Sequence, residues 1–260
     1  MQDDYGNVTL VNVSGIYDEQ PLFIDKLKKG GAGVIDAVSM TGTNGYCDDM
    51  AKENFREMMK KYPTKGIHFI DGGNYHYLTL LWLSLIEEPF DLIVFDNHSD
   101  MQKPAFGDVL SCGGWIRNLV EDSGFKGKVT VVGVDKDNID KEMKELGVKF
   151  ITKQTILKKR GQQYGLENEL IDKCWTGKRP VYISVDKDVL DEKEYKTNWN
   201  QGVMSVDELF AIIEDTFEMR KVIGMDICGE MDEAVNSEFG SIYNEINQAV
   251  NMRFLKFRIS

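Results

Sequence analysis

Residues 91–102 read Asp-Leu-Ile-Val-Phe-Asp-Asn-His-Ser-Asp-Met-Gln, and this stretch decides the fold class. Residues 92–95 are a short apolar run, typical of a strand buried on both faces of a parallel sheet. Asp96, His98 and Asp100 follow at every second position, so an extended backbone would place their side chains on one side. Ligands of open α/β sheets bind at the carboxyl ends of the strands. The spacing therefore indicates a metal site, although acids that cap a solvated turn would show the same pattern.

Two further apolar runs end in candidate metal ligands. Residues 181–191 read Val-Tyr-Ile-Ser-Val-Asp-Lys-Asp-Val-Leu-Asp, with Asp186 and Asp188 two positions apart. His76 follows a glycine turn in residues 71–76, Asp-Gly-Gly-Asn-Tyr-His. Four clustered carboxylates would repel one another, and some would have to bind protons. Two divalent cations would balance their charge and two imidazoles would help complete the ligand shells, as in a two-metal hydrolase.

These three stretches resemble the metal motifs of the arginase/agmatinase (ureohydrolase) family, in the same order, over about residues 66–232. The second and third motifs match closely, whereas the first has Asn74-Tyr75 where the family has an acid directly before the histidine. The resemblance implies two Mn²⁺ ions per chain, bound at His76, Asp96, His98, Asp100, Asp186 and Asp188. Oxygen and nitrogen donors favour Mn²⁺, and Fe²⁺, Co²⁺ and Zn²⁺ stay open.

The resemblance implies hydrolysis of a linear C–N bond in a guanidino or amide compound. A hydroxide bridging the two ions would attack, because metal binding lowers the pKa of water. Asp100 lies near the bridging position in the family and would carry a proton from the hydroxide to the leaving amine. A cationic substrate needs a carboxylate partner, since a desolvated guanidinium without one is costly. Glu230 is expected to supply it, with Gly229 bending the backbone; Asp226 is the other candidate.

Three departures separate this chain from arginases and agmatinases. Glu230 stands one residue later than the family's substrate-pairing glutamate. The loop after the second motif has no histidine, and Cys112 in that loop is expected to pack against Trp115. Asp191-Glu192 replaces the usual Asp-Pro. Arginine is therefore not the expected substrate. A non-catalytic metal-binding protein and an amide deacetylase on a related fold stay open as alternatives.

Composition limits the possible partners. The 260 residues carry a net charge of −12, which argues against nucleic acid and anionic membrane surfaces, because both need basic patches. The polar N-terminus lacks a signal peptide, and no apolar run approaches the roughly 20 residues of a membrane span. Four scattered cysteines fit reduced thiols. We expect a cytoplasmic homo-oligomer that acts on a small-molecule, cationic substrate.

Strands and helices alternate along the chain. Strands are expected at residues 8–13, 66–71, 92–95, 128–134, 148–152, 181–186 and 222–227. Residues 30–33 indicate a turn, and residues 34–49 carry no assignment. His68, inside the second strand, is expected to be a core or sheet-face histidine. The alternation predicts one three-layer αβα domain over residues 1–260 with a mainly parallel sheet, and the resemblance implies about eight strands.

Overall fold

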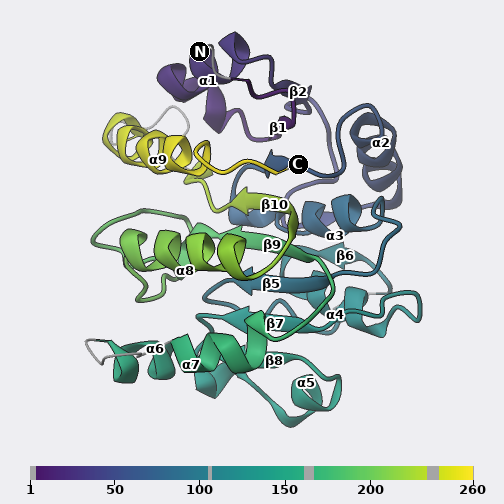
Figure 1. The fold of residues 1–260 in the computed structure, drawn as a ribbon. Helices are drawn as coiled ribbons and strands as arrows, with labels where there is room; N and C mark the ends of the chain where they lie inside the picture. Colours follow the sequence, from purple (N-terminus) through teal and green to yellow (C-terminus); the bar gives the residue numbers. More distant parts are fainter. Residues whose placement is uncertain (1–3, 105–106, 161–166, 233–239, 260) are drawn as a thin grey trace.

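The computed structural model describes residues 4–104, 107–160, 167–232 and 240–259. Eight parallel strands form the central sheet in the order β2-β1-β4-β10-β9-β5-β7-β8 (Figure 1). The strands are β1 Val8–Asn12, β2 Gly33–Asp36, β4 Ile67–Phe69, β5 Asp91–Phe95, β7 Val129–Val132, β8 Lys149–Ile151, β9 Val181–Asp186 and β10 Val222–Cys228. The central strands are buried along their whole length, as their continuous apolar runs predict.

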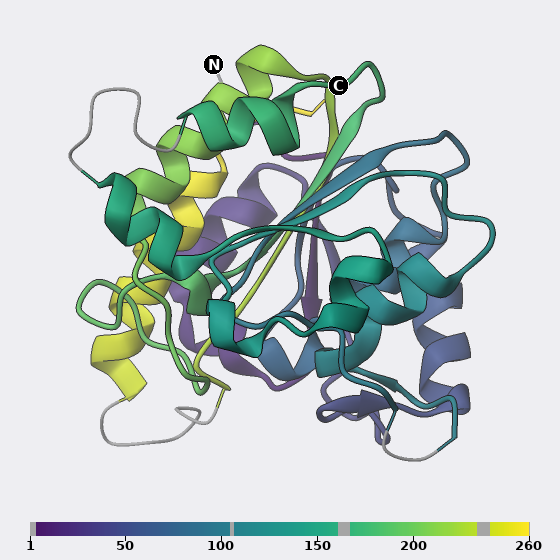
Figure 2. The same cartoon turned by 90° about the horizontal axis from the view of Figure 1, so that it is seen from below.

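Helices cover both faces of the sheet. One face packs against α1 Pro21–Lys29, α6 Lys153–Lys159, α7 Glu167–Leu170, α8 Val206–Met219 and α9 Gly240–Phe254. The other face packs against α2 Asp49–Met59, α3 Leu78–Leu83, α4 Trp115–Glu121 and α5 Lys141–Glu145. Figure 2 shows α8 and α9 on one side of the strands and α2 on the other. The predicted three-layer αβα fold is therefore confirmed, while a single domain over residues 1–260 stays a prediction.

Local signals explain where several helices begin and end. The hydroxyl of Ser205 accepts a hydrogen bond from the Glu208 backbone, and the Glu208 side chain accepts one from the Ser205 backbone. This capping box opens α8, and its Ser-x-x-Glu spacing stands in the sequence. The strongly apolar stretch over residues 77–88 is helical only in its first half, and α3 stops at Leu83. The Ser84 hydroxyl there donates to the Leu81 carbonyl at 2.7 Å, a local bond that competes with helix continuation.

Several short elements were missed from the sequence, among them helix α6 and three strands. β2 begins inside the expected turn at residues 30–33 and forms one edge of the sheet, paired only with β1 among the described strands. Its four residues are too few to show a clear alternation. β3 Tyr46–Cys47, in the stretch left without an assignment, pairs with β6 Leu110–Ser111 in a small antiparallel sheet. This pairing places Tyr46 and Cys47, just before α2, beside Leu110 and Ser111 in the loop after the second motif. No helix within the described ranges has the length and apolarity that crossing a membrane requires.

Candidate metal centre

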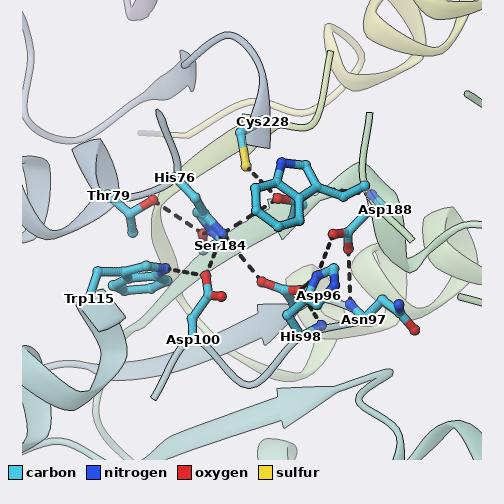
Figure 3. Close-up of polar contacts among 12 residues, drawn as sticks. His76, Thr79, Asp96, Asn97, His98, Asp100, Trp115, Ser184, Asp188 and Cys228 are labelled. Carbon is cyan, nitrogen blue, oxygen red and sulfur yellow. Dashed lines mark hydrogen bonds and ion pairs between the residues drawn. The ribbon is translucent and has the colours of Figure 1, made fainter. Parts of the chain in front are cut away.

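The three motifs meet at one edge of the sheet. β4, β10, β9 and β5 are consecutive neighbours in the sheet, and parallel strands end at the same edge. The turn after β4 carries His76, and the turn after β5 carries Asp96, His98 and Asp100. β9 ends at Asp186, which is followed by Asp188. All six predicted ligands therefore belong to adjacent strand ends, and Figure 3 shows the cluster that they form.

His76 faces three carboxylates. Its Nδ1 lies 3.0 Å from Asp100 Oδ2, 3.3 Å from Asp96 Oδ2 and 3.6 Å from Asp186 Oδ2. All four side chains are buried. His76 Nδ1 and Asp96 Oδ2 have no hydrogen-bond partner, although burying such an atom without one costs free energy. A bound cation would satisfy both atoms at once.

His98 faces the other side of Asp96. Its Nδ1 lies 2.7 Å from Asp188 Oδ2 and 3.5 Å from Asp96 Oδ1. Asp96 thus presents one oxygen toward His76 and the other toward His98. The candidate ligand atoms fall into two groups, and within each group all atoms lie within 4.8 Å of one another. The first group comes from His76, Asp96 and Asp100, and the second from Asp96, His98 and Asp188. Two groups that share a carboxylate fit two neighbouring cations.

A hydrogen-bond chain orients His76. Its Nε2 lies 2.9 Å from the Ser184 hydroxyl, and that hydroxyl donates to Asp226 Oδ1 at 2.6 Å. Because the hydroxyl proton is directed to Asp226, the hydroxyl oxygen is available to accept the Nε2 proton. Nδ1 then keeps its lone pair for a cation. Histidine ligands of metals commonly donate their second ring N–H in this way. Asp226, the other candidate for pairing with a cationic substrate, thus accepts the Ser184 proton and is not among the residues that line the cavity beside the cluster.

The charges perturb the pKa values in the cluster. Burial, together with Asp188 and Asp96, raises the pKa of Asp186 to about 7. Burial and Asp96 raise the pKa of Asp188 to about 6. Burial lowers the pKa of His98, but its hydrogen bonds to Asp188 and Asp96 outweigh burial and raise it to about 12. The cluster therefore needs positive charge, which protons or divalent cations can supply.

A cavity of about 190 Å³ opens beside the cluster. Its wall includes His98, Asp100, Asp186 and Asp188, and the remaining lining side chains are Gln102, Ser111, Cys112 and Trp199. The sequence analysis gave no role to Trp199, whose ring stands edge-on to His98 with centroids 5.6 Å apart. Cys112 packs against the apolar cluster that contains Trp115, as predicted, and also lines the cavity. Two larger hollows, of about 270 and 400 Å³, lie elsewhere and include none of the six ligands.

The structure corrects the expected orientation of Glu230. Its fully buried carboxylate forms an ion pair with Lys187 and accepts hydrogen bonds of 2.7 Å from both Gln20 and Asn251, instead of facing the cavity. Gly229 does bend the backbone, with φ of +89°, but the bend turns Glu230 away from the cluster. A Cβ at Gly229 would lie 2.5 Å from Asp186 Oδ1, so a side chain does not fit there.

The structure also identifies one candidate ligand that the sequence analysis missed. Cys228 is the last residue of β10, and its sulfur forms a third donor group with His76 and Asp186. The signal in the sequence is the period-2 step from Asp226 to Cys228 at a strand end.

By contrast, His68 is a core residue, as predicted. Its ring stacks on Trp82 with centroids 3.9 Å apart, and burial lowers its pKa to about 4.

Together, the fold and the site define a parallel three-layer α/β protein with a candidate two-cation centre at the carboxyl edge of its sheet. The model of the arginase family matches residues 27–231. The chain therefore belongs to the arginase family, as its motifs predict. An uncharacterized protein from Thermotoga maritima is 30% identical over 227 residues, which cover 87% of this chain and 80% of that protein.

Solved structures share the fold over almost the whole chain. Formimidoylglutamase from Bacillus subtilis subsp. subtilis str. 168 aligns with a TM-score of 0.69 and 17% identity, covering 98% of this chain and 87% of that one. Trypanosoma cruzi formiminoglutamase, solved with Mn²⁺, aligns with a TM-score of 0.67 and 14% identity, covering 98% and 94%. At these identities the comparison establishes the fold, and the site must supply the argument for function.

Proposed function

We propose that this protein is a divalent-metal-dependent hydrolase that cleaves a linear C–N bond in a small guanidino, amidine or amide compound. The observation that carries the proposal is the buried His76 Nδ1 and Asp96 Oδ2, both without partners, inside a cluster of four acids and two imidazoles. The cluster borders a cavity of a size suited to a small molecule. Family membership and the hydrolase names of the structural neighbours support the same reaction class.

The six side chains suit two cations. We assign one cation to His76, Asp96, Asp100 and Asp186, and the second to Asp96, His98, Asp186 and Asp188. When bound, two divalent cations would activate water as a nucleophile near neutral pH and stabilise negative charge on the reacting group. Mn²⁺ is the family-based choice, and it is the ion named for the Trypanosoma cruzi relative.

Asp100 is the proposed proton carrier. It lines the cavity, and its Oδ2 accepts a 2.7 Å hydrogen bond from the Trp115 indole. This bond fixes the orientation of the carboxylate. Asp100 would take a proton from the attacking water and deliver it to the leaving nitrogen, as a general base and then a general acid. Its backbone has φ of +48°, which is uncommon for a residue with a side chain and is found at functional sites.

The polarity of the cavity bears on the substrate. Every carboxylate among its described lining residues is one of the assigned ligands, and Glu230 is paired with Lys187. The reason for expecting a cationic substrate is therefore lost. Gln102 and Ser111 offer neutral hydrogen-bonding groups, and Trp199 offers an apolar ring. We propose that these three side chains orient the substrate.

Metal loading and a substrate panel test the proposal. Chelator-treated protein would be reloaded with Mn²⁺, Fe²⁺, Co²⁺ or Zn²⁺, and elemental analysis should find two ions per chain. The loaded forms would be assayed on agmatine, arginine, guanidino acids, formimidoyl amino acids and acylated amines. Asp188→Asn should lose activity, whereas Asp137→Asn, an exposed acid outside the site, should keep it.

The outcomes separate the competing functions. Turnover of a panel compound that requires metal and Asp188 supports the hydrolase. Two bound ions without turnover of any compound would favour a non-catalytic metal-binding protein. A folded protein that binds no ion would overturn the centre itself.

A further inference from the structure

We propose that the Cys228 thiolate is an additional ligand of the cation held by His76 and Asp186, so that the centre prefers Zn²⁺, Co²⁺ or Fe²⁺ over Mn²⁺. The inference deepens the proposed function, because it rests on the same cluster. It also departs from the expectation of a centre with oxygen and nitrogen donors alone.

The geometry places the sulfur at the site. Cys228 Sγ lies 3.3 Å from Asp186 Oδ2, and both lie within 4.8 Å of a ring nitrogen of His76. A zinc ion binds sulfur at about 2.3 Å and oxygen or nitrogen at about 2.0 Å, so two of its ligand atoms lie at most about 4.3 Å apart. The distance from sulfur to oxygen meets this limit. The 3.6 Å between His76 Nδ1 and Asp186 Oδ2 meets it as well.

The backbone holds the thiol in this place. Cys228 pairs with Asp186 in the parallel register of β10 and β9, in the middle of the sheet. Both residues are almost completely buried, so neither side chain has room to turn into solvent. Figure 3 shows the sulfur directed at the group that includes His76. A rigid position matters because coordination requires the donor to be in place before the ion arrives.

The Cys228 thiol contacts polar atoms, so it does not act only as an apolar side chain that fills the core. Its hydrogen bond goes to Asp186 Oδ2, a carboxylate oxygen that a cation would also require. His76 Nδ1, nearby and buried, has no hydrogen-bond partner. Within the described part of the chain, no other cysteine belongs to a donor group of this kind. A cation between sulfur, nitrogen and oxygen would satisfy all three, and the thiol proton would leave to solvent on coordination.

The chemistry of the donors predicts the metal preference. Thiolate is a soft ligand, which favours Zn²⁺, Co²⁺ and Fe²⁺. Mn²⁺ stands lowest of the divalent first-row ions in general affinity and prefers oxygen donors. Adding one sulfur to a shell of carboxylates and imidazole therefore shifts the preference away from Mn²⁺.

Cobalt titration of the full chain tests the inference. Metal-free protein would be titrated with Co²⁺ and followed by absorption, with elemental analysis to count the ions. Wild type should bind two Co²⁺ and show a thiolate-to-cobalt charge-transfer band in the near ultraviolet. Cys228→Ser should lose the band and its preference for Zn²⁺ over Mn²⁺ in competition. Cys112→Ser, the matched control on the cavity wall, should keep both.

Each outcome decides a different point. Two Co²⁺ without the band in wild type, or a band that survives in Cys228→Ser, would overturn the thiolate ligand and leave the proposed hydrolase standing. Wild type that binds no Co²⁺ would overturn both proposals. X-ray absorption of the zinc-loaded wild type does not depend on any variant folding. It should find a sulfur neighbour at about 2.3 Å from zinc, and a shell of oxygen and nitrogen alone would contradict the proposal.

Discussion

Asp186, Lys187 and Asp188 are consecutive, yet their side chains enter two different charged environments. The two aspartates join His76 and His98, where buried polar atoms lack partners. Lys187 points the other way and meets Glu230, Asn251 and the ring of Tyr195. β9 ends at Asp186 and a 3-10 turn over Lys187–Val189 follows, so the turn, and not the extended strand expected there, separates these side chains.

The two environments differ in how their charges are balanced. Around Lys187, Glu230 neutralises the ammonium, and Gln20 and Asn251 supply further hydrogen bonds. These bonds join the start of α1, the end of β10 and α9. The aspartate cluster instead has more carboxylate charge than its two histidines can balance. A buried charge group that is satisfied internally supports the fold, whereas one that is not satisfied marks a binding site.

Glu230→Gln should give the largest effect on stability. It leaves the buried Lys187 without a counter-charge, which costs about 3–5 kcal/mol in the free energy of unfolding. Chemical denaturation would measure the loss, and elemental analysis should still find the wild-type number of ions. A double variant, Lys187→Met with Glu230→Leu, should recover much of the stability, because it removes both charges. Normal stability with loss of substrate affinity would restore Glu230 as the substrate anchor.

Asp186→Asn should change the aspartate cluster, and it should lower the free energy of unfolding only when metal is present. At a cation concentration of about 100 Kd, each bound cation should add about 2.7 kcal/mol to the free energy of unfolding of wild type. The variant should lose this gain and bind fewer than two ions. Without metal it should be at least as stable as wild type, because one repelling carboxylate is gone. Melting curves with and without metal test this, with Asp137→Asn as the exposed control. An undiminished metal-induced shift would contradict the ligand assignment.

Ser184→Ala should have a smaller effect on metal binding. The change removes the link between His76 Nε2 and Asp226, so the ring loses its fixed orientation. Comparable losses around metal-bound histidines weaken affinity about 10–100-fold. Competition with a chelator would measure affinity, and the ion count at saturation should not change. Ser84→Ala is the control, because the Ser84 hydroxyl donates to the Leu81 carbonyl and not to a metal ligand. Equal affinity in both variants would exclude the orienting role.

The pH dependence of the metal-free protein tests the charge balance of the aspartate cluster without any variant. Folding raises the pKa of Asp186 to about 7 and of Asp188 to about 6, from about 3.9 in the unfolded chain. The folded state therefore holds protons that the unfolded state releases, and this stability is lost as pH rises from about 4 to 7. His98, with its pKa raised to about 12, adds a loss above about pH 6.5.

Melting temperatures measured between pH 5 and 8 test whether the metal-free protein loses stability as pH rises. With chelator present the melting temperature should fall as pH rises, by about 2–4 °C for each kcal/mol lost. Saturating metal should reduce or reverse the fall, because cations replace the protons. His68 opposes part of this fall up to about pH 6.5, because burial lowers its pKa to about 4 and the unfolded chain binds that proton instead. A metal-free protein that becomes more stable between pH 6.5 and 8 would therefore contradict the pKa values of the cluster.

The sequence by itself determined the layered fold and the six candidate ligands. Continuous apolar runs identify buried parallel strands, and the acids and histidines that follow them, together with the family resemblance, identify the ligands. The backbone there turns instead of staying extended, with φ of +48° at Asp100 and a 3-10 turn at Lys187–Val189. Both sequence signals are local, since they depend only on residues a few positions apart. The position of His68 inside an apolar run predicts a buried histidine, which its stacking on Trp82 confirms.

Only the tertiary structure decided which distant residues meet. Cys228 lies opposite Asp186 because β10 pairs with β9 in one register. Glu230 meets Lys187, 43 positions away, because the bend at Gly229 sends its side chain to the far side of the strand end. A shift of one residue along a strand moves each side chain to the opposite face of the sheet. The pairing register between strands therefore decides whether an acid joins a binding site or an internal ion pair. Register is set by packing between strands that are distant in the chain, and no local pattern records it.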